Sequence, residues 1–327
     1  MIARTTFHSE EAANRRQSML LAVIVLVVLA ALGFAIGYGV SGDLGTAYIV
    51  VLGAVLLSLL LTAGSYFGGD SLVLSTSHAH EVTAQQAPQL FDVVQEMAIA
   101  GNVPMPRVYI IDDSAPNAFA TGRDPKHASV AITTGLLQKL DREELQGVIG
   151  HEMSHVRNYD IRFTLLVAVL VGGIALLADI FIRFTFFGGG PRRGGNREGG
   201  AGALQLILFV VAIVLAILAP IFGRLVQLAV SRQREYLADA SSVELTRNPA
   251  GLERALAKIA SDQDVLEVAN RATQHLYIVN PIKKVEARAH GLFSTHPPIV
   301  DRINRLRELT GDPPLDPKAI RQLQGLD

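Results

Sequence analysis

Four apolar runs, each long enough to cross a membrane as a helix, constrain this chain more than any other feature. A helix satisfies every backbone N–H and C=O group within one segment, and about 20 residues of helix span the hydrocarbon layer. The runs occur as two close pairs, which predicts two membrane hairpins separated and followed by polar segments. The four runs cover residues 19–40, 48–67, 165–182 and 203–222.

The composition agrees with a membrane protein and narrows its chemistry. Hydrophobic residues make up 50% of the chain and charged residues only 18%, a balance typical of membrane proteins. The formal net charge of −1 argues against nucleic acid as a partner. Because the chain has no cysteine, a metal site must use histidine and carboxylate ligands.

The first apolar run predicts an uncleaved membrane anchor. It is longer than the apolar core of a secretory signal peptide, and a second span follows it after a short turn. Arg4, Arg15 and Arg16 precede the first span, whereas the loop between the first two spans has no basic residue. By the positive-inside rule, the N-terminus and the chain from Gly68 onward are expected in the cytoplasm.

The second pair of runs fits this topology less well. The same orientation places the Gly-rich loop 183–203 outside the cytoplasm, yet this loop carries four arginines. Either both runs cross against the positive-inside bias, or they dip into the membrane without crossing. The expected organisation is an N-terminal hairpin at 1–69, a first domain part at 70–164, the second hairpin at 165–222 and a second domain part at 223–327.

The polar segments predict an α+β domain. Short β-rich runs and amphipathic patterns of helical period follow one another between Gly, Pro and Asn signals. The run 118–121 is expected to be a short edge strand that pairs in a hairpin with 127–133. Further strands are predicted at 71–75 and 107–112, and helices at 88–100, 223–244, 250–260 and 298–310.

The sequence HEMSH at residues 151–155 carries the clearest chemical signal. Asp141 and Glu144 form a capping box, which predicts that a helix begins there. On that helix His151 and His155 lie one turn apart on one face, where two imidazoles can bind one metal ion. The alternative is an ordinary amphipathic helix whose two buried histidines only form hydrogen bonds.

Glu152 is placed to act on water rather than on the metal. It lies about 100° around the helix from His151, close to the open position of a bound ion. A catalytic zinc lowers the pKa of water, and Glu152 can take the proton and pass it to the leaving amine. The motif therefore predicts a metalloprotease.

A third ligand must come from elsewhere, because a catalytic zinc usually has three protein ligands and one water. If the second hairpin is antiparallel about a pivot near residue 193, the position opposite His155 is residue 231. Glu235 and Asp239 follow it, one helical turn apart. We expect Glu235 to be the third ligand.

Asp239 is then expected to accept a hydrogen bond from a ligating imidazole and to fix its tautomer. Two alternatives stay open for this helix. Glu235 can be a surface carboxylate paired with Arg232 or Arg234, and Asp239 can be a surface charge.

Several segments together resemble one known family. Besides HEMSH, they are SRQREYLADA at 231–240, PNAFATG at 116–122 and STHPP at 294–298. With the two apolar pairs around a Gly/Arg-rich loop, they resemble the HtpX-type membrane zinc metalloproteases, which are related to the CaaX prenyl proteases. The resemblance covers nearly the whole chain; one departure is His80, where many relatives have an arginine.

The resemblance implies a fold and an activity. The fold is an α-helical multi-pass membrane protein with a cytoplasmic α+β protease domain of the zincin, gluzincin-like type. The activity is that of a zinc endopeptidase in the bacterial inner membrane, which degrades misfolded or damaged membrane proteins in protein quality control. It also implies one Zn²⁺ held by His151, His155 and Glu235, with Glu152 as the catalytic acid and base.

Two further segments are expected to serve a polypeptide substrate. The segment Asn117, Ala118, Phe119 and Ala120 can offer an open strand edge to an extended peptide, because backbone pairing tolerates many sequences. The alternative is a structural strand in which Asn117 makes a turn. His296 can donate a hydrogen bond to the oxyanion, or it can simply pack at a helix start.

Two rival functions remain to be weighed. An intramembrane protease would place its motif inside an apolar run, which the charged flanks Arg142, Glu143, Arg157 and Asp160 disfavour. A non-catalytic membrane scaffold or chaperone with a vestigial zinc site is the other rival. The intact set of His151, Glu152, His155 and Glu235 argues against it.

Overall fold

The computed structural model describes residues 7–165, 210, 213, 234–262, 264, 278 and 297–323. Nearly all of the predicted second hairpin, the loop 183–203 and His296 lie outside the described residues. The chain divides into two compact units. One unit comprises residues 16–67 and 166–227, and the other comprises 1–15, 68–165 and 228–327.

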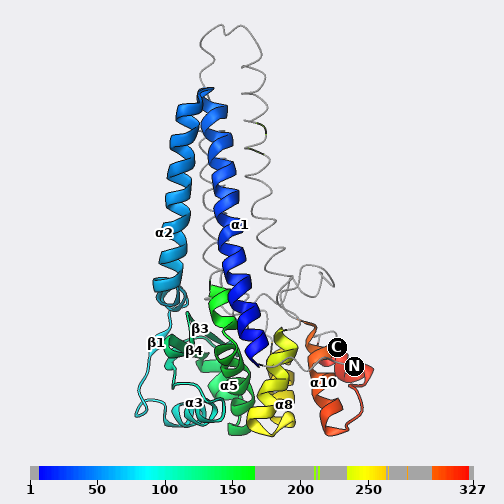
Figure 1. The fold of residues 1–327 in the computed structure, drawn as a ribbon. Helices are drawn as coiled ribbons and strands as arrows, with labels where there is room; N and C mark the ends of the chain where they lie inside the picture. Colours follow the sequence, from blue (N-terminus) through cyan, green and yellow to red (C-terminus); the bar gives the residue numbers. More distant parts are fainter. Residues whose placement is uncertain are drawn as a thin grey trace. The chain divides into compact units, whose positions relative to one another are not determined.

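The first two apolar runs are helical throughout. They lie in α1 (Phe7–Ser41) and α2 (Leu44–Thr76), which Figure 1 shows in blue. Among the described residues, α2 is the one helix that is long and apolar enough to cross a membrane, with a mean hydropathy of 2.4 in its best window. The two helices approach closely at Gly37, where a Cβ atom would lie 2.8 Å from the Cα of Ala47.

The predicted strand at 71–75 is wrong, because these residues form the last turns of α2. Once a helix is established, each further residue adds a hydrogen bond at little entropic cost, so a five-residue alternation does not stop it. Val73 and Leu74 are buried and Leu72 is exposed, which is the pattern of a helix end packed on one side. The first strand is instead the two-residue β1 (His80–Glu81).

A four-stranded sheet forms the frame of the second unit, with the order β1-β2-β4-β3. β2 (Arg107–Ile111) is parallel to β4 (Ala128–Thr133), and β3 (Ala118–Gly122) is antiparallel to β4. The predicted hairpin is confirmed, with Ala118 opposite Ile132. The prediction of an edge strand is also confirmed within the described residues, since β3 is the last strand of the sheet there.

Helices pack against this sheet and enclose the larger of two apolar clusters. α3 (Pro88–Ala100) and α8 (Pro249–Ser261) contact α5 (Arg142–Arg157), and α10 (Ile299–Thr310) contacts α8, as Figure 1 shows. α5 also contacts β3. Two shorter helices, α4 (Thr134–Lys139) and α11 (Pro317–Leu323), and the 3₁₀ turn η1 (Pro125–His127) also belong to this unit. The α+β content predicted for this part of the chain is confirmed.

The start of α5 is the predicted capping box. The Asp141 side chain accepts a hydrogen bond from the Glu144 backbone, and the Glu144 side chain accepts one from the Asp141 backbone. Lys258 of α8 adds an ion pair to the buried Glu144 carboxylate at 2.7 Å. Farther along, Gly147 permits close contact with α8, because a Cβ atom there would lie 2.7 Å from the Leu252 nitrogen. Local caps and close packing thus fix the position of the motif helix.

Candidate active site

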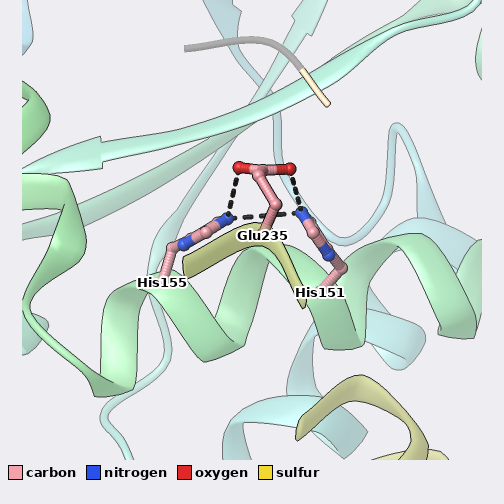
Figure 2. A group of neighbouring side chains, drawn as sticks. All are labelled: His151, His155 and Glu235. Carbon is pink, nitrogen blue, oxygen red and sulfur yellow. Dashed lines mark hydrogen bonds and ion pairs between the residues drawn. The ribbon is translucent and has the colours of Figure 1, made fainter. Parts of the chain in front are cut away.

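His151, His155 and Glu235 converge on one point. The two imidazole Nε2 atoms are 3.2 Å apart. The Glu235 carboxylate lies over both, with Oε1 3.6 Å from Nε2 of His155 and Oε2 3.6 Å from Nε2 of His151. Figure 2 shows the two rings rising from α5 toward Glu235, which comes from the helical segment 234–246.

The chemistry of this donor set fits a zinc ion. Two imidazole nitrogens and one carboxylate oxygen, all within 4.8 Å of one another, form the His₂Glu set of catalytic zinc sites. The site is enclosed, because His151 is 1% exposed and Glu235 is 8% exposed. That burial removes the alternative of Glu235 as a surface carboxylate.

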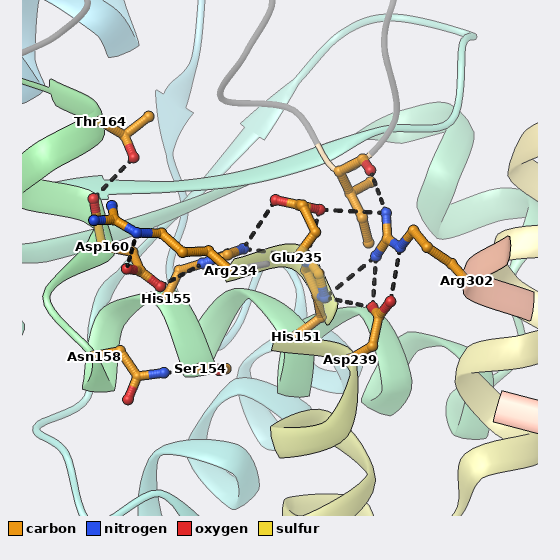
Figure 3. A network of polar contacts seen from close by, with 11 residues as sticks. His151, Ser154, His155, Asn158, Asp160, Thr164, Arg234, Glu235, Asp239 and Arg302 are labelled. Atoms are coloured by element: carbon orange, nitrogen blue, oxygen red, sulfur yellow. Dashed lines mark hydrogen bonds and ion pairs between the residues drawn. The ribbon is translucent and has the colours of Figure 1, made fainter. Parts of the chain in front are cut away.

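His151 belongs to a buried chain of charged groups, which we call the inner arm: His151, Asp239 and Arg302. Its Nδ1 lies 2.9 Å from Oδ1 of Asp239 and 3.3 Å from Nη2 of Arg302. The shorter contact, with a carboxylate, assigns the proton to Nδ1 and leaves the lone pair of Nε2 for the metal position. Arg302 of α10 donates two hydrogen bonds to the Asp239 carboxylate, at 2.6 and 2.8 Å (Figure 3). The prediction that Asp239 contacts an imidazole of the motif is confirmed.

His155 belongs to a second chain of the same composition, the outer arm: His155, Asp160 and Arg234. Nδ1 of His155 lies 3.0 Å from Oδ2 of Asp160, and Nε of Arg234 lies 3.5 Å from Oδ1 of the same carboxylate (Figure 3). Both imidazoles therefore turn Nδ1 toward a carboxylate and Nε2 toward the metal position. The two arms thus fix the orientation of both rings.

The two arms shift the pKa values of the two imidazoles in opposite directions. Burial, together with the charge of Arg302, lowers the pKa of His151 despite the opposing Asp239. Burial acts the same way on His155, but the hydrogen bond to Asp160 and the charge of Glu235 outweigh it and raise the pKa to about 9. In the absence of a metal, His151 is neutral and His155 is protonated at neutral pH.

Glu152 is buried beside the three converging residues. Burial, aided by the negative charge of Glu235, raises the pKa of Glu152 to about 7, although the charge of a protonated His155 opposes the shift. A backbone hydrogen bond from Ala120 of β3 also lowers this pKa and links the carboxylate to the edge strand. A carboxyl group of this kind can both take and give a proton near neutral pH.

The edge of β3, where residues 117–120 are predicted to bind a peptide, is already paired at one point. The Ala118 carbonyl accepts a hydrogen bond of 3.0 Å from the backbone nitrogen of Ile278. The Asn117 side chain accepts one from the Ala118 nitrogen, at 3.1 Å. Asn117 itself is buried and shapes the start of the strand. An incoming peptide would have to displace Ile278 or pair beyond Ala118.

Sequence reasoning missed Arg302, Asp160 and the role of Arg234 as a partner of Asp160. A signal for Arg302 does exist, because it falls among Ile299, Ile303 and Leu306 at helical spacing and so interrupts the buried face of α10. Asp160 lies just beyond the end of α5 and resembles an ordinary surface charge in the sequence. Its role depends on the turn that follows the helix.

Comparison with known proteins agrees with this geometry. Residues 84–310 match the model of Peptidase family M48. The chain belongs to this family. It is also 45% identical over 306 residues to a "Protease HtpX homolog" of Lactobacillus acidophilus, a match that covers 92% of this chain and 99% of the relative.

Two further relatives carry the same name. The one from Streptococcus uberis is 43% identical over 92% of this chain and 99% of the relative. The one from Streptococcus equi subsp. equi is 47% identical over 85% of this chain and 91% of the relative. The chain is thus an HtpX-type member of peptidase family M48 and a metalloprotease, and α2 is compatible with its being a membrane protein.

Proposed function

We propose that this enzyme is a zinc-dependent endopeptidase that cleaves misfolded or damaged membrane proteins at the cytoplasmic face of the bacterial inner membrane. The observation that carries the proposal is the convergence of His151, His155 and Glu235 on one point. These residues come from helices far apart in the sequence, and their burial gives the site the enclosed character that metal catalysis requires.

The three converging residues would hold one Zn²⁺. When bound, zinc supplies a Lewis acid that polarises a peptide carbonyl and lowers the pKa of water toward neutrality. Asp239 and Asp160 hold both rings with Nε2 toward the metal position, so neither ring has to reorient when it ligates, and His155 has only to release its Nε2 proton.

Glu152 acts on protons in this mechanism. Its carboxylate takes a proton from the attacking water and then delivers it to the nitrogen of the leaving amine. In the metal-free chain, burial raises the pKa of Glu152 to about 7, and the positive charge of a bound zinc ion would lower it from there. His296 remains a proposed donor to the oxyanion that forms on the substrate carbonyl.

The substrate is proposed to bind as an extended peptide along the edge of β3. Support comes from the position of this strand at the end of the sheet and from the backbone hydrogen bond between Ala120 and Glu152. A peptide on this edge would lie beside the catalytic carboxylate. Pairing through the backbone would suit substrates of varied sequence, as damaged proteins are.

The membrane part of the proposal rests on the four apolar runs. Two hairpins would hold the protease domain near the bilayer, where membrane proteins are accessible substrates. Single cysteines introduced into the loop 183–203 of this cysteine-free chain provide the test. Labelling from outside intact cells is expected, whereas labelling only after permeabilisation would reject a crossing second hairpin.

The catalytic assignment is tested by Glu152→Gln in the purified full chain. We expect casein hydrolysis to fall by about 10²–10⁴-fold while one zinc per chain is retained, because general acid–base catalysis contributes that much and Glu152 is not a ligand. Glu143→Gln is the matched control, since Glu143 lies on the same helix with its side chain exposed. If Glu152→Gln degraded casein as fast as the unmodified enzyme, the assignment would be refuted.

A further inference from the structure

Arg302 is the largest fully buried side chain among the described residues, with 1% exposure. It lies in the middle of α10 and reaches the active site from a helix that supplies none of the three converging residues. Burial of an arginine is costly unless its donors are satisfied by partners. Its contacts therefore indicate what the residue is for.

Each nitrogen of the guanidinium group has a partner at or beside the site. Nε and Nη2 donate to the two oxygens of Asp239, at 2.8 and 2.6 Å, and Nη2 also lies 3.3 Å from Nδ1 of His151. Nη1 donates to the Ile278 carbonyl at 2.9 Å and lies 3.4 Å from Oε2 of Glu235. A planar fork that matches a carboxylate in two bonds is a geometry that lysine does not provide.

The position is unexpected for a positive charge, because a site for a metal cation should repel it. The surrounding charges resolve this conflict. Asp239 neutralises Arg302 through its two hydrogen bonds, and Arg302 in turn holds the pKa of Asp239 below its usual value although burial alone would raise it. A fully ionised Asp239 is the stronger acceptor for the Nδ1 proton of His151.

We propose that Arg302 is a positioning residue that sets zinc affinity by fixing Asp239 and, through it, the ring of His151. Arg302 holds the carboxylate at both oxygens, so Asp239 keeps one orientation against Nδ1 of His151. That contact directs Nε2 toward His155 and Glu235. A second role follows from Nη1, which restrains Ile278 where its nitrogen pairs with β3 at Ala118.

A merely structural arginine would hold α10 in place without affecting the metal. Arg307 on the same helix provides the matched control. It forms an ion pair of 2.7 Å with Glu253, and this pair lies away from the site. The inference rests on the proposed zinc site, so zinc binding by the unmodified chain is measured first. Failure to bind zinc there would reject the proposed function itself.

The experiment measures zinc dissociation constants of the metal-free full chain in detergent, by competition with a chelator. We expect Arg302→Met to weaken zinc binding by about 10–100-fold, the range found when a residue supporting a ligand is removed. Arg302→Lys should weaken it by a smaller factor, because it keeps the charge and loses the fork. Arg307→Gln should leave the constant unchanged while lowering the unfolding temperature.

A double-mutant cycle distinguishes action through Asp239 from an independent effect. If Arg302 acts through Asp239, Arg302→Lys and Asp239→Asn together should weaken zinc binding no more than Asp239→Asn alone. Cobalt-substituted protein should show a changed visible spectrum in both single variants. The proposal would be overturned by additive effects, or by zinc binding in Arg302→Lys that matches or exceeds that of the unmodified chain. Arg302→Lys decides the outcome if Arg302→Met does not fold.

Discussion

The inner and outer arms have the same chemical composition but differ in how the chain builds them. Asp160 of the outer arm follows His155 by five residues, so the contact is local. The inner arm joins three segments, namely α5, the helix 234–246 and α10. Its arginine is fully buried and donates two short hydrogen bonds to its carboxylate, whereas Nε of Arg234 lies 3.5 Å from the carboxylate of Asp160.

The difference shows how the two ligands of one motif can depend on different parts of the fold. His155 receives its carboxylate as soon as the turn after α5 forms. His151 receives its carboxylate only when residues beyond the second apolar pair fold back onto α5. The carboxylate of the inner arm therefore depends on tertiary structure, whereas the carboxylate of the outer arm is local and only its arginine comes from a distant segment.

Of the changes that distinguish the two arms, Asp239→Asn is expected to have the largest effect on zinc affinity. This change weakens the acceptor for His151 and leaves the buried Arg302 without its counter-charge, so zinc affinity should fall by about 10–100-fold. Chelator competition measures the constant. Glu244→Gln is the control, because Glu244 is exposed on the same helix. Equal zinc affinity in Asp239→Asn and the control would show that the inner arm does not support zinc binding.

Asp160→Asn should weaken zinc binding less, by about tenfold. The side chain of His155 is 16% exposed, so water can replace part of the lost contact. If this variant lost more zinc affinity than Asp239→Asn, the ranking of the two arms would be reversed.

The same variant should alter the dependence of zinc binding on pH. Asp160 helps to raise the pKa of His155 to about 9, so His155 must release a proton when it ligates and affinity should rise with pH up to that value. Calorimetry in buffers of different ionisation enthalpy counts the protons released. Asp160→Asn should release fewer at pH 7.5, and an unchanged number would contradict the role given to Asp160.

The unfolding free energy of the metal-free chain should also depend on pH through His155. A His155 pKa raised from 6.5 to about 9 on folding stabilises the fold fully below pH 6.5, and this stabilisation is lost as the pH rises through 9. The difference in unfolding free energy between the unmodified chain and Asp160→Asn should therefore shrink across that window. Denaturant unfolding at several pH values measures it, and a constant difference would reject the linkage.

The smallest effect is expected at the start of α5, away from both arms. Asp141→Ala removes half of the capping box and should cost about 1 kcal/mol of stability. Because the arms stay intact, the zinc dissociation constant should not change. Denaturant unfolding and chelator competition on one sample check both expectations. A loss of zinc affinity would show that the arms depend on the helix start.

Local patterns made much of this structure predictable. The cap at Asp141, the phase of the helix that carries His151 and His155, and the hairpin of β3 with β4 all depend on neighbouring residues. Glu235 was reached through the expected hairpin geometry, although it is distant in the sequence. The strand predicted at 71–75 failed for the converse reason, because continuation of α2 outweighs a short alternation.

Arg302 and Asp160 were not predictable in the same way. Their roles depend on which carboxylate and which imidazole the tertiary structure brings within hydrogen-bond distance. Sequence spacing does not encode that distance for residues on separate helices. Of the supporting groups, Asp160 is thus local and Arg302 is long-range, and the partner of neither follows from sequence spacing alone.

Zinc titration of the metal-free full chain tests the central claim most directly, with the unmodified protein compared with Glu235→Gln. We predict one tightly bound zinc per unmodified chain, and zinc binding at least about a hundredfold weaker in Glu235→Gln, which loses the carboxylate ligand. Equal binding by both proteins, or no stoichiometric binding by the unmodified chain, would contradict the assignment of His151, His155 and Glu235 as the ligands.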